Sequence, residues 1–180
     1  GNKRYSSATG NSIRGLWGGG GNPSVYTTID YVIIASLGNS ILFGDLTFAR
    51  EGLSAFSSPT RGVFGGGFTP TSLNVIDYIT IASTGNAQDF GDLSSPKAGA
   101  SSCSSPTRGI YAGGFVPAPS ITNTIEYITI ATLGNSQDFG DLTTASSTNG
   151  EGGCSNATRG LFAKGITPSV TNAIDYITIA

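Results

Sequence analysis

Short runs of β-branched and aromatic residues alternate with turns marked by Gly and Pro along the whole chain. One such run, at 74–82, carries apolar side chains at both odd and even positions. This pattern is typical of a short strand in a sheet that is covered on both faces. Shorter strands are predicted around it at 53–58, 63–64 and 90–93, separated by turns and loops rich in Pro, Gly and Asn.

This group of four strands recurs along the chain. Arg-Gly begins at Arg14, Arg61, Arg108 and Arg159, and Phe-Gly-Asp-Leu begins at Phe43, Phe90 and Phe139. The acid of each Ile-Asp/Glu-Tyr lies 15 residues before the Asp of Phe-Gly-Asp-Leu in every complete unit, whereas the other two intervals vary between 16 and 18 residues. Because insertions are tolerated in loops and not in packed strands, two loops of each unit are variable.

Four short antiparallel strands in a repeat of about 47 residues are typical of a propeller blade. We therefore predict an all-β propeller, or a section of a larger one, with about four blades in a single repeat domain. The predicted blades are 1–46, 47–93, 94–142 and 143–180, and the last is expected to be incomplete because it lacks Phe-Gly-Asp-Leu. A β-solenoid is the alternative, but it usually has shorter repeats with one strand per turn.

Composition excludes several classes of function. The 180 residues include 27 Gly, no His and no Met, and the formal net charge is −2. Without His there is no base for a Ser-His-Asp or Cys-His site. The charge argues against nucleic-acid binding, and no apolar run approaches the ~18 residues of a membrane span. No cofactor or metal is expected, since Gly18–Gly21 lacks the Lys-Ser/Thr of a phosphate loop and 86–92 lacks the ligand spacing of a strong Ca²⁺ loop. We expect the chain, which starts with Gly1, to be a piece of a longer protein.

Two resemblances point to a family. The order of Gly65-Gly66, Asp77-Tyr78 and Phe90–Leu93 resembles a kelch-type β-propeller, with Phe90 where that family has Trp. The segments 58–67, 76–82 and 84–93 are similar to repeats in large structural proteins of marine tailed bacteriophages, including cyanophages.

The phage resemblance implies a non-enzymatic module of a tail fibre or another external appendage of the virion. Its expected partner is a host-surface glycan or protein, or a neighbouring virion protein, and it allows a homo-oligomer. It implies neither nucleic-acid binding nor membrane insertion. A carbohydrate-active propeller enzyme and a purely architectural spacer are the alternatives.

The variable loops are the predicted binding region. In a four-stranded blade both of these connections lie at the same end, and they contain residues that do not recur. The predicted ligand- or partner-binding residues are Tyr26, Phe48, Arg50, Glu51, Phe68, Lys97, Phe115 and Glu151. Exposed aromatic rings and Arg are common at interfaces, and aromatic rings also stack on sugars. Drift of unconstrained loops is the alternative explanation.

Residues that recur once per unit are predicted to be structural. They are Arg14, Arg61, Arg108 and Arg159, together with Asp45, Asp92 and Asp141. Each Arg is expected to bind a backbone carbonyl or an Asp of the same or the adjacent blade. The aromatic residue three positions after each Arg and the cysteines Cys103 and Cys154 are expected in the core. The pairs Asp89/Asp92 and Asp138/Asp141 could act as glycosidase carboxylates, but their recurrence favours a structural role.

Overall fold

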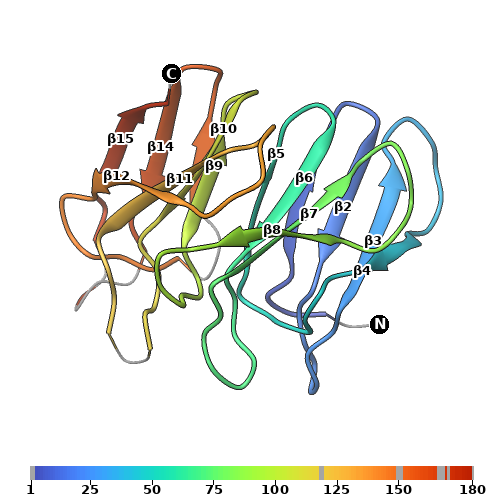
Figure 1. Cartoon of the computed structure of the whole chain (residues 1–180), viewed down its shortest axis with the longest axis horizontal. Coiled ribbons are helices and arrows are strands. Elements are labelled where there is room, and N and C mark those ends of the chain that lie inside the picture. Colours follow the sequence, from blue (N-terminus) through green and yellow to red (C-terminus); the bar gives the residue numbers. More distant parts are fainter. Residues whose placement is uncertain (1–2, 118–119, 149–151, 166–168, 170, 180) are drawn as a thin grey trace.

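A computed structural model describes residues 3–117, 120–148, 152–165, 169 and 171–179, and all regular structure within these ranges is β (Figure 1). The first sheet contains β1 (Ser7–Gly10), β2 (Arg14–Gly18), β3 (Thr28–Ile33) and β4 (Ile41–Asp45). The second contains β5 (Ser54–Ser57), β6 (Arg61–Gly65), β7 (Val75–Thr80) and β8 (Gln88–Asp92). The third contains β9 (Ser101–Ser104), β10 (Arg108–Ala112), β11 (Thr124–Thr129) and β12 (Gln137–Asp141). The fourth contains β13 (Gly153–Ser155), β14 (Arg159–Ala163) and β15 (Ile174–Thr178).

Each sheet is one blade of a β-propeller arrangement, and we number the blades 1 to 4 along the chain. Neighbouring strands within a blade are consecutive in sequence and antiparallel. The blades succeed one another across the molecule, so that blades 1 and 4 lie at opposite ends (Figure 1). This arrangement confirms the predicted all-β propeller fold. In the described part of the chain, blade 4 has three strands and no strand pairing joins it to blade 1.

The turn before each Arg-Gly is set by one polar side chain. The residue three positions before the Arg accepts a hydrogen bond from the Arg backbone N–H, at 2.9 Å for Asn11 and 3.1 Å for Ser58. Ser105 and Asn156 do the same in blades 3 and 4, at 3.1 and 2.8 Å. Asn and Ser favour such turns because their short side chains can bind the nearby backbone. The constant length of this turn follows from that contact.

The Phe-Gly-Asp motif forms a β-bulge in the outer strand. The register of β7 against β8 shifts between Ile76 and Asp77, so Phe90 is the extra residue on β8. The same shift occurs at the equivalent place in blades 1 and 3. A bulge turns its side chain out of the regular ladder. Here it buries Phe90 to 3% exposure, against the edge of the Tyr78 ring.

The core lies between the blades as three successive clusters. Leu16, Ile29 and Phe43 of blade 1 pack against residues of blade 2 such as Phe64 and Ile81. Equivalent clusters join blade 2 to blade 3 and blade 3 to blade 4. Both faces of an inner blade are therefore covered, which explains the apolar residues at odd and even positions of its third strand. None of the described residues belongs to a helix long and apolar enough to cross a membrane.

Candidate functional site

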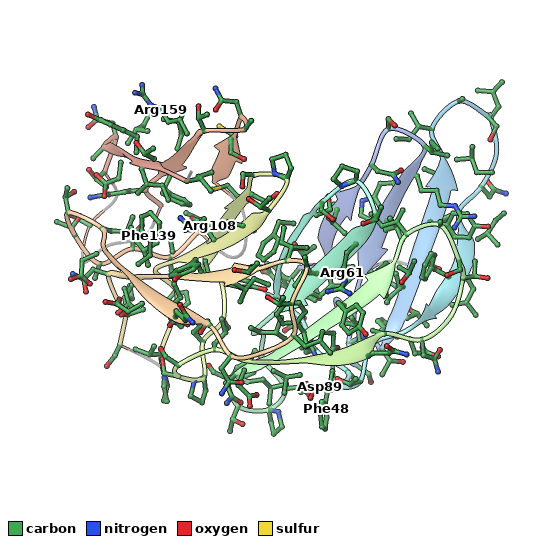
Figure 2. The ribbon with its side chains drawn as sticks, turned by 45° about the horizontal axis from the view of Figure 1, so that its top comes forward. Phe48, Arg61, Asp89, Arg108, Phe139 and Arg159 are labelled. Atoms are coloured by element: carbon green, nitrogen blue, oxygen red, sulfur yellow. The ribbon has the colours of Figure 1, made fainter. Side chains whose placement is uncertain are left out.

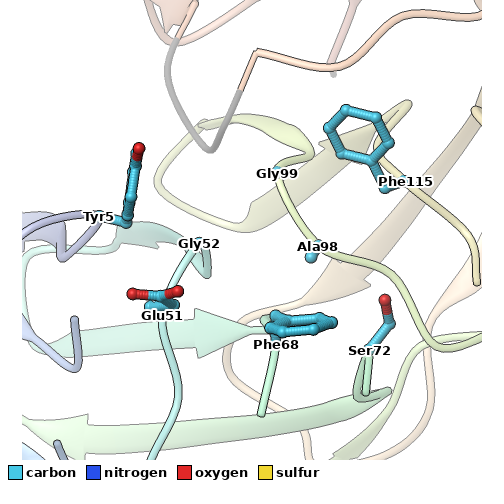
Figure 3. A pocket seen from close by; sticks show the side chains of 8 residues that line it. All are labelled: Tyr5, Glu51, Gly52, Phe68, Ser72, Ala98, Gly99 and Phe115. Atoms are coloured by element: carbon cyan, nitrogen blue, oxygen red, sulfur yellow. The ribbon is translucent and has the colours of Figure 1, made fainter. Parts of the chain in front are cut away.

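A pocket of about 300 Å³ opens on the loop end of blades 1 to 3 (Figure 3). The residues that line it are Tyr5, Glu51, Gly52, Phe68, Ser72, Ala98, Gly99 and Phe115. They come from the segment before β1, from the connections between blades, and from the loops between second and third strands. The expectation that the variable connections meet at one end is therefore confirmed.

The lining is built from positions that are equivalent in the repeat. Isolated antiparallel bridges join Arg4 to Gly21, Glu51 to Phe68, and Ala98 to Phe115. In each pair the first residue lies ten positions before the Arg of its unit and the second lies seven positions after it. The backbone at this end is thus repeated while its side chains differ from blade to blade. A constant scaffold with variable side chains is the arrangement in which loops carry recognition.

Tyr5 departs most clearly from the repeat. It lies nine residues before Arg14, where the next two units have Gly52 and Gly99. All three residues have left-handed backbone, with φ of 57° for Tyr5, 61° for Gly52 and 65° for Gly99. A residue with a side chain pays roughly 1–2 kcal/mol for that conformation, whereas glycine does not. Strain of this kind is concentrated at functional sites.

The strained Tyr5 side chain belongs to the pocket. It is 55% exposed, and Figure 3 shows its ring across the pocket from Phe115. Glu51 and the 41% exposed ring of Phe68 lie below them in this view. The sequence analysis missed Tyr5. Alignment of the units on their Arg would have revealed it as an aromatic residue at a glycine position.

The predicted binding residues divide into four groups, of which the buried pair Arg50 and Lys97 is described separately below. Glu51, Phe68 and Phe115 come together in the pocket. Tyr26 and Phe48 lie outside it: Tyr26 donates its hydroxyl to the carbonyl of Asn22 at 3.1 Å, and Phe48 is 54% exposed (Figure 2). Glu151 lies outside the described residues.

Arg50 and Lys97 require a correction, because we expected them to be exposed for a partner. Their side chains are 0% and 1% exposed. Arg50 pairs with Asp77 at 3.0 Å, and Lys97 pairs with Glu126. Each cation lies on the connection that precedes its blade. Its side chain points into the blade and pairs with the acid on the third strand of that blade. A buried carboxylate without such a partner would be strongly destabilising.

In the described part of each blade a Lys or Arg pairs with the acid of the third strand, but the cation comes from different places. In blade 1 Lys3 pairs with Asp30 at 2.7 Å. In blade 4 the position equivalent to Lys97 is Ser146. The carbonyl of Lys97 accepts the N–H of Gly67, and the carbonyl of Ser146 accepts the N–H of the equivalent glycine, Gly114. Lys164 takes over there and pairs with Asp175 at 3.0 Å. The acid therefore has the same position in every blade, whereas the position of the cation differs.

The pKa of Glu126 reflects this environment. Burial alone would raise the pKa of this carboxyl group. Hydrogen bonds donated by Lys97, Ser136 and Ser94 outweigh burial and hold the pKa below its ordinary value. The pKa of Asp175 is lowered by the same balance, since contacts from Thr143 and Lys164 oppose desolvation. Both acids are therefore charged at neutral pH.

The recurring Arg residues join adjacent blades, as predicted. Nη1 of Arg14 donates to the carbonyl of Ile81 at 2.6 Å, and Nη1 of Arg61 donates to Ile130 at 2.6 Å. Arg108 makes the equivalent bond to Ile179 at 3.1 Å. Each guanidinium also lies over a Tyr ring of its own blade, at 4.4 Å in the case of Arg61. Of the two partners that we expected, the carbonyl is the one used.

The recurring Asp residues contribute through their backbone. The N–H groups of Asp45 and Asp92 donate to the side-chain oxygens of Asn86 and Asn135, at 3.1 and 3.0 Å. These Asn residues lie in the turn before the outer strand of the next blade. Asp141, which precedes the three-stranded blade 4, is exposed. In blades 1 and 2 the motif therefore connects the outer strand to the turn that precedes the outer strand of the next blade.

The other candidate groups lie away from the pocket. Asp89 and Asp92 are on β8, and Asp138 and Asp141 are on β12; none of them lines the pocket of Figure 3. Among the described residues no group of three His, Cys, Asp or Glu side chains could hold a metal ion. Both cysteines are free, and Cys103 is buried whereas Cys154 is exposed. The expectation that both are buried was wrong for Cys154.

Comparisons with known proteins support the fold. No family model matches the chain, and no curated protein matches it. Among solved structures, that of YjhT superposes with a TM-score of 0.73 at 10% sequence identity. The match covers 91% of this chain and 59% of YjhT, so the chain spans about three fifths of the length of that protein. At this identity the likeness shows a propeller fold alone.

Proposed function

We propose that this chain is a non-enzymatic binding module of a bacteriophage virion appendage, and that the loop-end pocket binds a glycan of the host surface. The repeats are then a kelch-like set of the kind found in marine phage structural proteins. The phage origin rests on the resemblance of segments such as 58–67 and 84–93. The site rests on the structure of the loop end.

One observation carries the proposal: a strained Tyr replaces the glycine of the repeat and places its ring in the pocket. Selection for stability alone favours Gly at that position. Tyr5, Phe68 and Phe115 supply three aromatic rings, which stack on the apolar faces of sugar rings. Glu51 adds an acceptor for hydroxyl or amino groups.

Binding is favoured over hydrolysis by the number of acids. Glycoside hydrolysis commonly needs two carboxyl groups on either side of the scissile bond. The lining of the pocket contains one, Glu51. The Asp pairs of the outer strands lie elsewhere, so the enzyme alternative has no paired carboxylates in this pocket.

The test compares pocket variants with a matched control. We expect Tyr5→Gly and Phe115→Ala to weaken binding to polysaccharide from marine cyanobacterial surfaces at least tenfold, measured by isothermal titration or on a glycan array. Phe48→Ala, which removes an exposed ring outside the pocket, should leave binding unchanged.

Stability gives the second readout. Tyr5→Gly should raise the free energy of unfolding by about 1 kcal/mol, because glycine adopts the left-handed backbone conformation without the strain that Tyr5 has. The same variant should lose binding. The proposal fails if the pocket variants bind normally. It also fails if Tyr5→Gly destabilises the fold, since Tyr5 would then be a packing residue.

A further inference from the structure

The loop-end pocket carries a negative charge that the cations around it do not neutralise. Among the described residues that line the pocket Glu51 alone is charged, and none of the ion pairs in the described structure includes its carboxylate. The two cations that the sequence predicted here, Arg50 and Lys97, are buried and are already paired with Asp77 and Glu126. The pocket therefore presents a net negative charge to a ligand.

Arg4 is a further cation at this end of the molecule. It holds the position equivalent to Glu51 in blade 1 and bridges to Gly21. The carboxylate of Glu51 reaches the same place, because its Oε2 would lie 2.8 Å from a Cβ on Gly21. In the described structure, however, Nη2 of Arg4 donates to Oδ1 of Asn22 at 3.2 Å and not to Glu51. The carboxylate is thus available to a cation from outside the chain.

Aromatic rings lie beside this carboxylate. Glu51 and Phe68 form an antiparallel bridge in which each backbone N–H donates to the carbonyl of the other, at 3.2 and 2.8 Å. Side chains paired in this way point to the same face, with Cβ atoms about 5 Å apart. The rings of Tyr5 and Phe115 lie above this pair (Figure 3). The face of an aromatic ring attracts a cation within about 6 Å of its centre.

A small residue leaves room beside the third ring. Ala98 bridges to Phe115 as Glu51 bridges to Phe68, but its side chain is a single methyl group. The equivalent pair in blade 1, Arg4 and Gly21, supplies neither a ring nor an acid. A pocket of about 300 Å³ that combines three rings with one carboxylate is of the kind that encloses a small organic cation.

We infer that the loop-end pocket recognises an organic ammonium group, which Glu51 binds and which the rings of Tyr5, Phe68 and Phe115 surround. The inference rests on the proposed function and deepens it: the host glycan carries this group as the free amino group of a sugar or as the trimethylammonium of a choline substituent. Acidic glycans are disfavoured, because the described lining contains a carboxylate and neither Lys nor Arg.

A matched pair of ligands tests the charge. Isothermal titration compares the glucosamine tetramer, which has free amino groups, with its N-acetylated form, in which they are neutral amides. We expect the charged tetramer to bind at least tenfold more tightly at low salt, and this preference to shrink as the ionic strength rises. Glu51→Gln, which keeps the shape of the side chain, should reduce the preference to about twofold or less. Asp89→Asn, which removes an exposed acid of β8 outside the pocket, should retain it.

Competition against the bound polysaccharide tests the rings and identifies the source of the ammonium group. Tetramethylammonium chloride should displace the polysaccharide more effectively than sodium chloride at the same ionic strength, because its methyl groups contact the aromatic faces. Phe68→Leu keeps an apolar side chain without a ring, and it should weaken this displacement at least threefold. Stronger displacement by choline than by glucosamine assigns a choline substituent, and the reverse assigns an amino sugar.

The outcomes separate this inference from the function on which it rests. If Phe115→Ala loses the polysaccharide while Glu51→Gln binds both tetramers as the unaltered chain does, the glycan site stands and the ammonium inference fails. Equal binding of the two tetramers, tighter binding of a sulfated polysaccharide, or binding of neither tetramer and neither small cation also overturns it. If the pocket binds choline or glucosamine but no polysaccharide, the ammonium inference stands and the glycan function fails.

Discussion

Replacing Arg61 by Ala should cost about 2–3 kcal/mol of unfolding free energy. The guanidinium gives the Ile130 carbonyl a hydrogen bond of 2.6 Å and lies 4.4 Å from the centre of the Tyr78 ring. A hydrogen bond to a charged group contributes about 1.5–3 kcal/mol, and the ring contact contributes about 0.5–1 kcal/mol at such a partly exposed site. The loss also leaves a carbonyl of blade 3 without its donor.

The chain supplies its own control for this variant. Arg159 occupies the same position in blade 4 and contacts Tyr176, but it has no carbonyl partner in the described structure. Arg159→Ala should therefore cost less than 1 kcal/mol. Urea unfolding, followed by near-UV circular dichroism at a concentration where the chain is monomeric, measures both losses. Equal losses for the two variants would refute the interblade role of Arg61.

Glycan binding should separate from stability in the same experiment. Arg61 follows the turn at the opposite end of blade 2 from the pocket. Arg61→Ala should therefore bind polysaccharide normally under conditions in which it remains folded. A variant that loses binding but keeps its stability would show that we have chosen the wrong end of the molecule.

Three further predictions concern buried groups. Because the folded-state pKa of Glu126 is lowered, the stability that it contributes is complete above its unfolded value of about 4.3 and is lost as the pH falls through the folded value. Glu126→Gln should flatten this part of the acid unfolding curve; an unchanged slope would contradict the ion pair. Lys164→Gly should cost about 3 kcal/mol in urea unfolding, and adding Ser146→Lys should recover at least half of it by restoring the cation of the inner blades. Burial raises the pKa of Cys103 to about 12, so a thiol reagent at pH 8 should modify Cys154 in the folded protein and Cys103 only after unfolding.

The fold was predictable because the repeat identifies its own rigid parts. The fixed 15-residue interval spans the third strand, its turn and the bulged outer strand, which are packed against the next blade. The role of Arg61 was predictable for a similar reason, since a charge that recurs beside a tight turn in every unit is expected to bind a partner that the repeat itself supplies, here the Ile130 carbonyl of the next blade. Recurrence is thus a reliable guide to structure.

The site was less accessible from sequence because its residues break the repeat. Arg50 and Lys97 looked like free loop charges, since sequence does not say which way a loop side chain turns. Asp77 and Glu126, each within an apolar strand, were the signal that a cation must come inward. Tyr5 was missed because the first unit was not compared with the glycines of the next two. Cys103 is buried because Gly160 of the following blade lies against its sulfur, whereas Cys154 has no such neighbour among the described residues.

The order of the ion pairs along the chain has a consequence for synthesis on the ribosome. Lys3, Arg50, Lys97 and Lys164 each precede the acid with which they pair. Domains generally form from the N-terminus as the chain emerges. When a third strand is synthesised, the cation that pairs with its acid is therefore already part of the nascent chain, except in blade 4, where Lys164 precedes Asp175 by only a short loop. None of these four ion pairs depends on a residue that is made later. The Arg-to-carbonyl bonds run the other way, from Arg14 forward to Ile81, so a nascent blade can complete its own charge balance before it docks onto its successor.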